Sequence, residues 1–384
     1  MNAFEFRTVP AVLVEFGAAA RLGFLLRERF DQKRLCLVTD KFLHRSGLLA
    51  PALASLKDVG WTVQVIDDVV ADPPEAVVLA AAASARSAGA ELILGLGGGS
   101  SMDVAKLIAV LAASDQPLQD MYGIGKVRGP RLPLVQMPTT AGTGSEVTPI
   151  SIITTGAATK AGVVSPHLYA DLTVLDAELT LGLPAHVTAA TGIDAIVHSI
   201  EAYTTRLKKN PLSDMLARQA LSLLSANLLP AFRDGSNRAA REALLLGAML
   251  AGQAFSNAPV AAVHALAYPI GGIFHVPHGL SNALVLPHVM RFNAPVAAPL
   301  YAELAQLVLP AVGGSDEARA DAFIAHLEQL AVATGIERQL RQVGVKASDL
   351  GRLTQDAMLQ TRLLVNNPRD MNEQDIHAIY TAAY

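Results

Sequence analysis

The sequence lacks several features that mark secreted, membrane-bound or nucleic-acid-binding proteins. Its 384 residues include one cysteine, Cys36, so an internal disulfide is excluded and a reducing compartment fits. Only 17% of the residues are charged, and the 30 basic and 34 acidic side chains form no long cationic run. This balance argues against nucleic acid and acidic membrane surfaces as partners.

Long uninterrupted hydrophobic runs are also missing. The most apolar stretch, 243–265, is broken by Gly247, Gly252 and Pro259 and falls short of a membrane span. Residues 1–20 mix acidic and basic side chains with apolar ones, which a secretory signal or a transit peptide does not do. We therefore expect a soluble, cytoplasmic protein with no membrane partner.

Apolar residues, in contrast, are abundant and regularly ordered. Hydrophobic residues make up 51% of the chain, and its length suits two domains at about 150 residues each. In the first half, short apolar runs alternate with helix-like segments, which predicts a parallel sheet covered by helices. The strand-like runs stop near Pro184, and only long periodic helices are expected after it.

We therefore predict an α/β domain over residues 1–182 and an all-helical domain over residues 183–384. The predicted strands are 35–39, 62–66, 91–96, 134–137 and 172–175. The predicted helices include 74–88, 101–113, 212–232, 238–255 and 316–333.

Four polar residues in the second half have the identity and spacing of a metal site. Asp194 and His198 are four residues apart in a helix-like stretch, so their side chains project from one face. His264 belongs to a second helical run, and His278 follows soon after it. Three imidazoles and one carboxylate, with no thiolate, suit Fe(II) or Zn(II). Spacing alone also allows each of these residues to have an ordinary packing role.

A glycine-rich turn in the first half has the character of a phosphate-binding loop. The predicted strand ending at Leu96 runs into Gly97 to Asp103, which reads GGGSSMD, and an amphipathic helix follows. Glycines let a phosphate approach the backbone, and a helix start offers free amides and a positive dipole end. The segment is neither a Gly-x-Gly-x-x-Gly fingerprint nor a Walker loop, which disfavours ATP. The alternative is a glycine-rich turn without a ligand.

Two further polar features follow predicted strands. The segment Pro138 to Glu146 contains hydroxyl side chains and two glycines, which suit phosphate or ribose in the crevice of an open α/β sheet. Asp40 follows the strand 35–39 and is placed to accept hydrogen bonds from a ribose hydroxyl. An ordinary helix-capping role is equally compatible with its position.

Together these motifs resemble the iron-containing, group III alcohol dehydrogenase family. The resemblance runs along the chain from Phe16-Gly17 to Asn367-Pro368-Arg369. The matching segments are Gly97 to Lys106 (GGGSSMDVAK), Pro138 to Thr148 (PTTAGTGSEVT), Ala190 to Ala195 (ATGIDA) with His198, and Pro277-His278-Gly279.

The resemblance implies a dehydroquinate synthase-like fold, in which a Rossmann-like dinucleotide-binding domain precedes a helical metal-binding domain. It also implies an NAD(P)-dependent oxidoreductase that forms homodimers or larger homo-oligomers. An acid at Asp40 is similar to the NAD-preferring members, because a carboxylate repels the ribose 2′-phosphate of NADP. The family's metal ligands fall on Asp194, His198, His264 and His278. Its cofactor contacts fall on Asp40, Gly97, Gly98, Ser100, Asp103, Thr139, Thr140 and Lys160.

The resemblance further places Ile150, Phe255 and Val260 near the substrate, which favours aliphatic alcohols over polyols. The chain departs from the family at one position. Many members carry a further His four residues after the third ligand, thought to help move protons, where this chain has Tyr268. We name His275 as the substitute, although a structural role beside the site fits it equally well.

We therefore expect a metal-dependent, NAD-linked alcohol dehydrogenase acting on a small aliphatic alcohol or hydroxy acid. The metal would bind the alcohol oxygen as a Lewis acid while hydride passes to the nicotinamide, and the reverse reaction would reduce an aldehyde or ketone. One alternative is a lyase or polyol-phosphate dehydrogenase of the same superfamily, but residues 189–200 and 258–279 contain no Lys or Arg to hold an anionic substrate. Another is a catalytically inactive nucleotide-binding regulator, which predicts a broken ligand set, whereas all four ligands are present.

Overall fold

A computed structural model describes residues 3–156 and 159–384, and contacts within the chain divide it into two units. The first unit contains Thr8–Thr140 and Gly144–Gly182 and has an α/β fold. The second contains the N-terminal stretch up to Arg7, the short segment Ala141–Thr143, and Leu183–Tyr384, and it is helical.

A six-stranded sheet lies at the centre of the α/β unit, in the order β1-β9-β6-β4-β2-β3, and every neighbouring pair is parallel. This confirms the predicted parallel sheet, and five of its strands match predicted ones. Their apolar runs are long because central parallel strands are buried on both faces. The strands are β1 (Val12–Val14), β2 (Arg34–Asp40), β3 (Thr62–Val69), β4 (Leu92–Gly97), β6 (Leu134–Pro138) and β9 (Leu172–Leu175).

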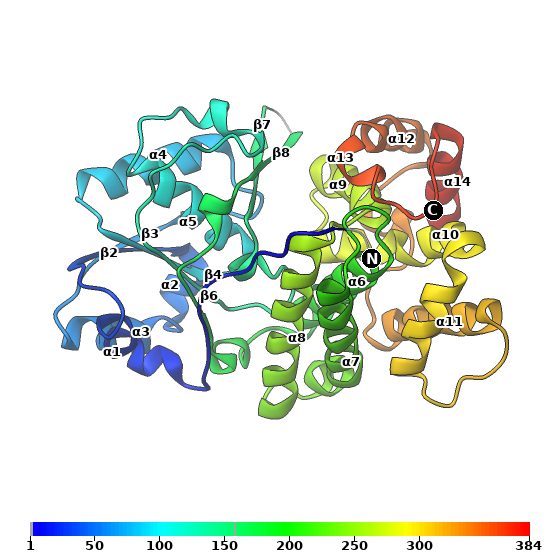
Figure 1. The fold of residues 1–384 in the computed structure, drawn as a ribbon, viewed down its shortest axis with the longest axis horizontal. Helices are drawn as coiled ribbons and strands as arrows, with labels where there is room; N and C mark the ends of the chain where they lie inside the picture. The colour runs from blue at the N-terminus through cyan, green and yellow to red at the C-terminus, as the bar shows by residue number, and fades with distance from the viewer. Residues whose placement is uncertain (1–2, 157–158) are drawn as a thin grey trace. The chain divides into compact units, whose positions relative to one another are not determined.

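Helices cover both faces of this sheet (Figure 1). On one face, Leu37 and Leu94 pack in one core cluster with Leu26 and Leu56 from the covering helices α1 and α3. Gly95 points to the opposite face, where a Cβ would lie 2.9 Å from the Cβ of Ala105 in α5, so glycine permits close helix packing there. The helices of this unit are α1 (Leu22–Arg27), α2 (Lys41–Ser46), α3 (Ala50–Asp58), α4 (Glu75–Ser87) and α5 (Gly99–Leu111).

A second, three-stranded sheet in the same unit was not predicted from the sequence. It contains β5 (Gly123–Ile124), β7 (Ile150–Thr155) and β8 (Thr159–Val164) in the order β5-β8-β7, with β7 and β8 antiparallel. Isoleucine and threonine, which fill most of β7, favour strands, so its sequence signal was present and was overlooked.

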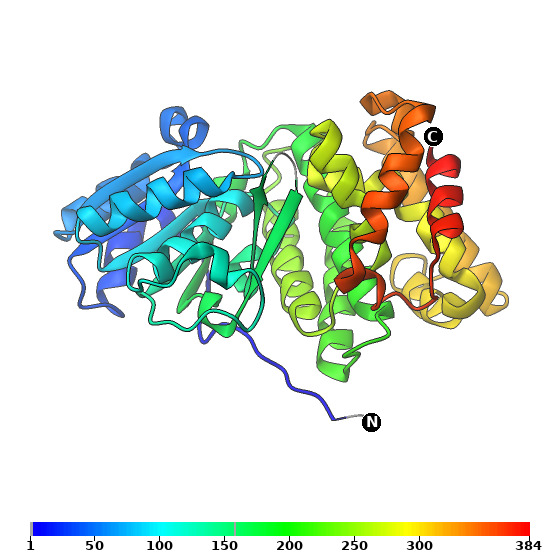
Figure 2. The same cartoon turned by 90° about the horizontal axis from the view of Figure 1, so that it is seen from above.

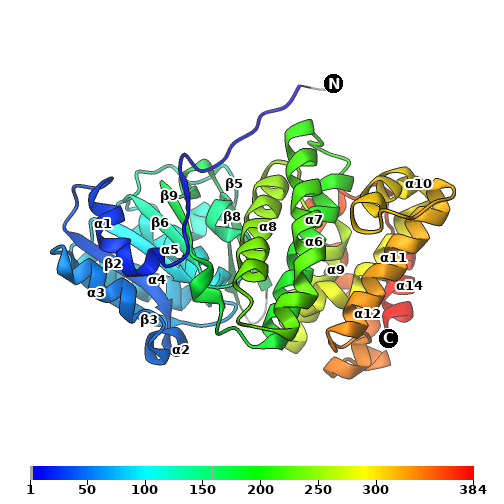
Figure 3. The same ribbon diagram turned by 90° about the horizontal axis from the view of Figure 1, so that it is seen from below.

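The second unit contains only helices among its described residues, as predicted for residues after Pro184. Helices α6, α7 and α8 run side by side (Figure 3), and α12 packs beside α14 (Figure 2). No single described helix is long and apolar enough to cross a membrane, and only α8 and α9 taken together, bent by 107°, pass that test. The helices are α6 (Ala185–Thr204), α7 (Pro211–Arg233), α8 (Arg238–Asn257), α9 (Ala262–Phe274), α10 (His278–Val308), α11 (Asp316–Ala333), α12 (Leu350–Met358), α13 (Thr361–Leu364) and α14 (Glu373–Ala383).

Helix α6 positions the predicted metal ligands because it runs through the interior of this unit. Its residues are buried from Gly192 to its end at Thr204, including the polar ones. Helix α10 approaches it closely at Gly279, where a Cβ would lie 2.2 Å from the backbone oxygen of Ala190. Glycine at this position therefore lets the start of α10 reach the buried face of α6.

Candidate metal and nucleotide sites

The four predicted metal ligands converge in the helical unit. Asp194 and His198 come from α6, His264 from α9, and His278 is the first residue of α10. One ligand atom from each lies within 4.8 Å of the others, close enough to converge on one ion. The first three residues are buried, whereas the side chain of His278 is 39% exposed. The cluster is thus accessible on the side of His278.

The environment favours the protonation states that bind metal. Burial lowers the pKa of His198 to about 3, so its imidazole is neutral at pH 7. Burial alone would raise the pKa of the Asp194 carboxyl, but the three imidazoles and the Asn282 amide outweigh it and hold that pKa below its usual value. A neutral imidazole and an ionised carboxylate are the forms that bind a divalent cation, so the donor set fits a metal of borderline hardness.

Two residues that the sequence reading missed lie directly behind these ligands. The carboxylate of Glu201 accepts from the Nδ1 atom of His264 at 2.6 Å and from the backbone N–H of Val263 at 2.7 Å. The amide nitrogen of Asn282 donates to the Asp194 carboxylate at 2.6 Å. Both could have been found in the sequence, since Glu201 lies seven residues after Asp194 on α6, and Asn282 lies four residues after His278 on α10.

The predicted phosphate-binding segments meet at the carboxyl-terminal edge of the parallel sheet in the α/β unit, where its strands end. Asp40, Gly97 and Thr139 stand at the carboxyl ends of β2, β4 and β6, which are neighbours in the sheet. The N–H of Thr139 donates to the carbonyl of Gly97 at 2.9 Å, which joins the two loops. Gly98 is the N-cap of α5, so the free amides of that helix start, with Ser100 in its first turn, lie at this edge. Such an edge is where open α/β sheets bind ligands.

Asp40 also has the structural role that its position allowed. Its carboxylate accepts a hydrogen bond from the backbone N–H of Leu43 at 2.9 Å and so caps α2. This contact engages one carboxylate oxygen, Oδ1. Capping and a contact with ribose are therefore compatible.

Asp103 and Lys160 make contacts within the α/β unit. The Asp103 carboxylate accepts from the Ser145 hydroxyl at 2.5 Å and from the backbone N–H of Ile152 at 2.8 Å. Asp103 therefore attaches both Ser145 and β7 to α5. Lys160, on β8, forms an ion pair with Asp72.

The buried Lys106 reinforces the same region. Its ammonium donates to the hydroxyls of Ser145 at 2.7 Å and Thr148 at 3.1 Å, and to the carbonyl of Ile150 at 2.6 Å. Burial lowers its pKa, and the nearby Asp103 opposes that shift. The loop after β6 is thus held in place by a charged group that the sequence reading did not single out.

Comparisons with known proteins agree with this geometry. The family description "Iron-containing alcohol dehydrogenase" matches residues 10–177, and "Fe-containing alcohol dehydrogenase family, C-terminal" matches residues 188–384. The long-chain-alcohol dehydrogenase 1 of Geobacillus thermodenitrificans is 40% identical over 365 residues, which cover 93% of this chain and 91% of that protein.

The chain belongs to the iron-containing alcohol dehydrogenase family. The NAD-dependent methanol dehydrogenase of Bacillus methanolicus is 33% identical over 372 residues, covering 96% of this chain and 97% of that protein. The crystal structure of a 1,3-propanediol oxidoreductase superposes with a TM-score of 0.96 at 35% identity and covers 100% of both chains. Family membership and the donor set together identify an NAD-dependent, metal-containing alcohol dehydrogenase.

In this family member, Tyr268 on α9 lies against two of the candidate ligands. Its ring centroid is 6.5 Å from that of His264 and 5.9 Å from that of His278. His275 follows α9 as an exposed C-cap residue with a φ of 55°, a left-handed conformation that is uncommon for histidine. Tyr268 therefore contacts the ligand cluster directly.

The residues named for the substrate lie in both units. Phe255 on α8 stacks on His198 with ring centroids 4.4 Å apart, and Val260 is a buried residue between α8 and α9. Ile150 begins β7 in the α/β unit. In the helical unit, the structure thus places an aromatic side chain next to a candidate ligand.

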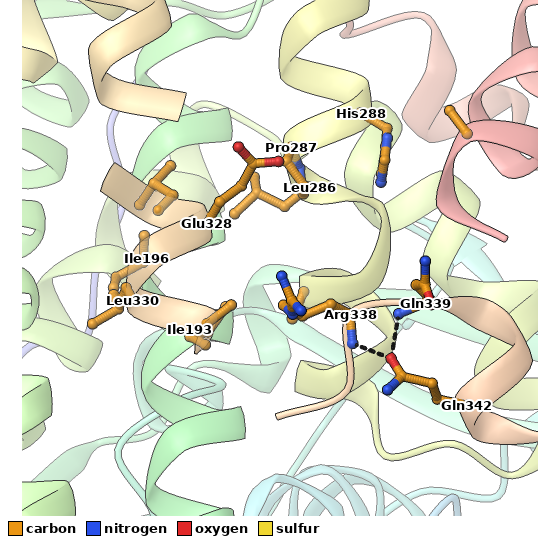
Figure 4. A pocket seen from close by; sticks show the side chains of 14 residues that line it. Ile193, Ile196, Leu286, Pro287, His288, Glu328, Leu330, Arg338, Gln339 and Gln342 are labelled. Carbon is orange, nitrogen blue, oxygen red and sulfur yellow. Dashed lines mark hydrogen bonds between the residues drawn. The ribbon is translucent and has the colours of Figure 1, made fainter. Parts of the chain in front are cut away.

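A separate pocket of about 380 Å³ lies between residues of α6, α10 and α11 (Figure 4). Ile193 and Ile196 of α6 contribute to its wall, with Leu286 and His288 from α10 and Glu328 from α11. Its lining includes none of the four candidate ligands.

Proposed function

We propose that this alcohol dehydrogenase catalyses reversible, NAD-linked oxidation of small aliphatic alcohols to the corresponding aldehydes or ketones. The observation that carries the proposal is the convergence of three imidazoles and one carboxylate within 4.8 Å, accessible at His278. We propose Asp194, His198, His264 and His278 as the residues that hold the metal, Fe(II) or Zn(II), since both suit this donor set.

Different residues of the chain would bind the metal, the cofactor and the substrate. The bound metal supplies Lewis-acid polarisation of the substrate oxygen. The first turn of α5 and the adjoining glycines would bind the pyrophosphate of the dinucleotide through backbone amides. We propose that Asp40 accepts from the ribose hydroxyls and disfavours NADP through its charge. The remaining cofactor contacts that we propose are Gly97, Gly98, Ser100, Asp103, Thr139, Thr140 and Lys160.

The proposed substrate surface is apolar. Ile150, Phe255 and Val260 carry no charge and would favour an aliphatic chain over a polyol. Two of the relatives are named for long-chain alcohols and for methanol. This range supports an alcohol as substrate and leaves the preferred chain length to experiment.

Proton transfer is the step for which the chain departs from its family. We propose that Tyr268 and His275 serve the proton route, Tyr268 because its ring lies against His264 and His278. Tyr268→Phe would remove the hydroxyl and keep the ring packing. If Tyr268 moves protons, this variant should change the pH profile of kcat, and His275→Gln should do so if His275 is the group involved.

The first experiment measures NADH formation by protein loaded anaerobically with Fe(II) or Zn(II), using primary alcohols, secondary alcohols, glycerol and small hydroxy acids. A sample treated with chelator and a sample reloaded with metal are the matched controls. Turnover that disappears with chelator and returns with metal supports the proposal. A metal-bound protein that oxidises none of these alcohols with NAD or NADP would favour the lyase, polyol-phosphate or regulatory alternatives.

We further propose that the protein is a cytoplasmic homo-oligomer. The support for a second copy is the resemblance to the family, which implies homodimers or larger homo-oligomers. Light scattering on the purified protein tests this proposal, and a monomer at micromolar concentration would contradict it.

A further inference from the structure

The buried carboxylate of Glu201 is fully engaged at the start of α9. Its side chain is 5% exposed, and it belongs to the same helix as Asp194 and His198. One oxygen lies 2.6 Å from the Nδ1 atom of His264, and the other accepts the backbone N–H of Val263 at 2.7 Å. Because burying a carboxylate without hydrogen-bond partners is costly, these two contacts satisfy a requirement of its buried position.

Glu201 also provides the hydrogen-bond acceptor that the N-terminus of α9 lacks in its own sequence. The N-cap residue, Ala261, has no side chain that can accept a hydrogen bond from the first turn. The carboxylate of Glu201, from another helix, accepts from that turn instead and lies near the positive end of the helix dipole. Glu201 therefore helps to position the start of α9, and with it His264.

The same contact fixes the protonation pattern of His264. An ionised carboxylate only accepts hydrogen bonds, so the Nδ1 atom of His264 must carry the proton that it shares with Glu201. The lone pair then resides on the Nε2 atom, the form in which an imidazole binds a metal through that nitrogen.

The two buried acids, Asp194 and Glu201, also contribute negative charge beside the candidate ligands. Asp194 lies among the candidate ligands and Glu201 directly behind one of them, and both are buried. Among the described residues, Asp194 and Glu201 form ion pairs with His278 and His264, and the segments 189–200 and 258–279 contain no Lys or Arg. Two carboxylates therefore match the two positive charges of a divalent cation.

We propose that Glu201 is a positioning residue, which sets the tautomer and direction of His264 and supplies the second negative charge that balances a divalent metal. This inference rests on the proposed function, because it assumes that Asp194 and the three histidines hold a metal. Outer carboxylates that orient a ligating histidine commonly strengthen metal binding by about 10- to 100-fold.

The decisive variant is Glu201→Gln. A glutamine amide has an oxygen in place of only one of the two carboxylate oxygens, and an NH2 group in place of the other, so it cannot accept from Val263 and His264 through two separate oxygens as Glu201 does. We expect the affinity for Co(II) and Zn(II), measured by competition with a chelator, to fall by about 10- to 100-fold. The visible spectrum of the Co(II) protein should also change, because it reports how His264 is placed. The matched control is Ser199→Ala, which removes a buried hydroxyl from the same helix that bonds only to Ala195 in that helix, at 2.9 Å.

Glu201→Asp keeps the charge and both acceptors but shortens the side chain by one methylene. It should lose less affinity than Glu201→Gln, and it carries the test if the glutamine variant does not fold. Wild-type affinity and an unchanged Co(II) spectrum in a folded Glu201 variant would overturn the inference. Failure of wild-type protein to bind Co(II) at all would instead overturn the proposed metal site, so the two failures are distinguishable.

Discussion

The ring of Phe255 stacks on the imidazole of His198, with centroids 4.4 Å apart and planes inclined by 21°. Both side chains are buried, and they come from two different helices, α8 and α6. An apolar aromatic face thus covers one side of a candidate metal ligand and helps to keep water away from it. This arrangement gives the candidate site both a metal-binding side and a hydrophobic side.

Substituting Phe255 tests the hydrophobic side. Phe255→Ala should lower kcat/KM for 1-butanol by about tenfold relative to glycerol, because the apolar contact with the substrate chain is lost. The bound metal content should be retained, since Phe255 is not a ligand. Phe42→Ala, which changes an exposed phenylalanine on α2, is the control. An unchanged preference between the two alcohols would remove Phe255 from the substrate surface.

The metal ligands are tested by His264→Ala. We expect this variant to lose bound metal and at least about 100-fold of the activity, because a ligand and its contact with Glu201 are both removed. Circular dichroism should show that the protein stays folded. The matched control is His288→Ala, which removes a histidine of α10 that lines the separate pocket. If His264→Ala keeps wild-type activity, His264 is not part of the site.

The fold was largely predictable from the sequence. Strands β2, β4 and β6 are short runs of mostly apolar residues, bounded by glycine or polar segments. Short apolar runs with such boundaries are typical of buried strands. Strand β7 was overlooked although its residues, ISIITT, favour a strand. Lysine and glycine weaken the pattern of β8, which is held by pairing with β7, as Ile152 with Gly162.

The candidate site was predictable where its signal was local. Asp194 and His198 share a helix face, so their spacing alone brings them together. The approach of His264 to Glu201 depends on how α9 packs against α6, which no local pattern reports. Glu201 was missed for that reason, although an acid seven residues after Asp194 on the same buried helix is itself a signal.

The phosphate-binding loop is tested by Gly98→Ala. Gly98 has an ordinary extended backbone, and a Cβ there would lie 3.9 Å from the nearest atoms, those of Thr140, so the fold should accept alanine. We expect an unchanged melting temperature but a KM for NAD raised by about tenfold, because the methyl group would stand where the pyrophosphate approaches.

Gly182→Ala is the control for this variant, since nothing lies within 4 Å of the added Cβ. The KM for NAD should be unaffected there. Equal KM values for both variants and the wild type would indicate that the glycine-rich turn binds no cofactor.

Asp40→Asn separates capping from charge at the end of β2. Asparagine keeps an acceptor for the N–H of Leu43, so the stability should hardly change. Loss of the negative charge should raise kcat/KM with NADP relative to NAD by about tenfold. Asp58→Asn, at the exposed end of α3, should leave that ratio unchanged. A constant ratio in Asp40→Asn would contradict the assigned role in cofactor choice.

Glu146 gives the stability a defined pH dependence. Burial raises the pKa of its carboxyl from 4.5 to about 7, so the folded protein holds this proton more tightly than the unfolded chain does. The stability gained from the protonated form is complete below pH 4.5 and is lost as the pH rises to 7. The loss amounts to about 3 kcal/mol.

Glu146→Gln mimics the protonated carboxyl and should remove this dependence. The free energy of unfolding of Glu146→Gln minus that of the wild type should be larger at pH 8 than at pH 5. Urea denaturation of both proteins at both pH values measures this difference. An identical pH dependence in the two proteins would show that Glu146 does not titrate in this range.

Three helices provide the ligand atoms, and α6 is separated in the sequence from the consecutive helices α9 and α10 by α7 and α8. A bound ion would therefore act as a cross-link in a chain whose one cysteine is buried and has no disulfide partner. Part of the free energy of metal binding would then appear as folding free energy. Cellular metal supply would set the lifetime of this enzyme against proteolysis as well as its rate of turnover.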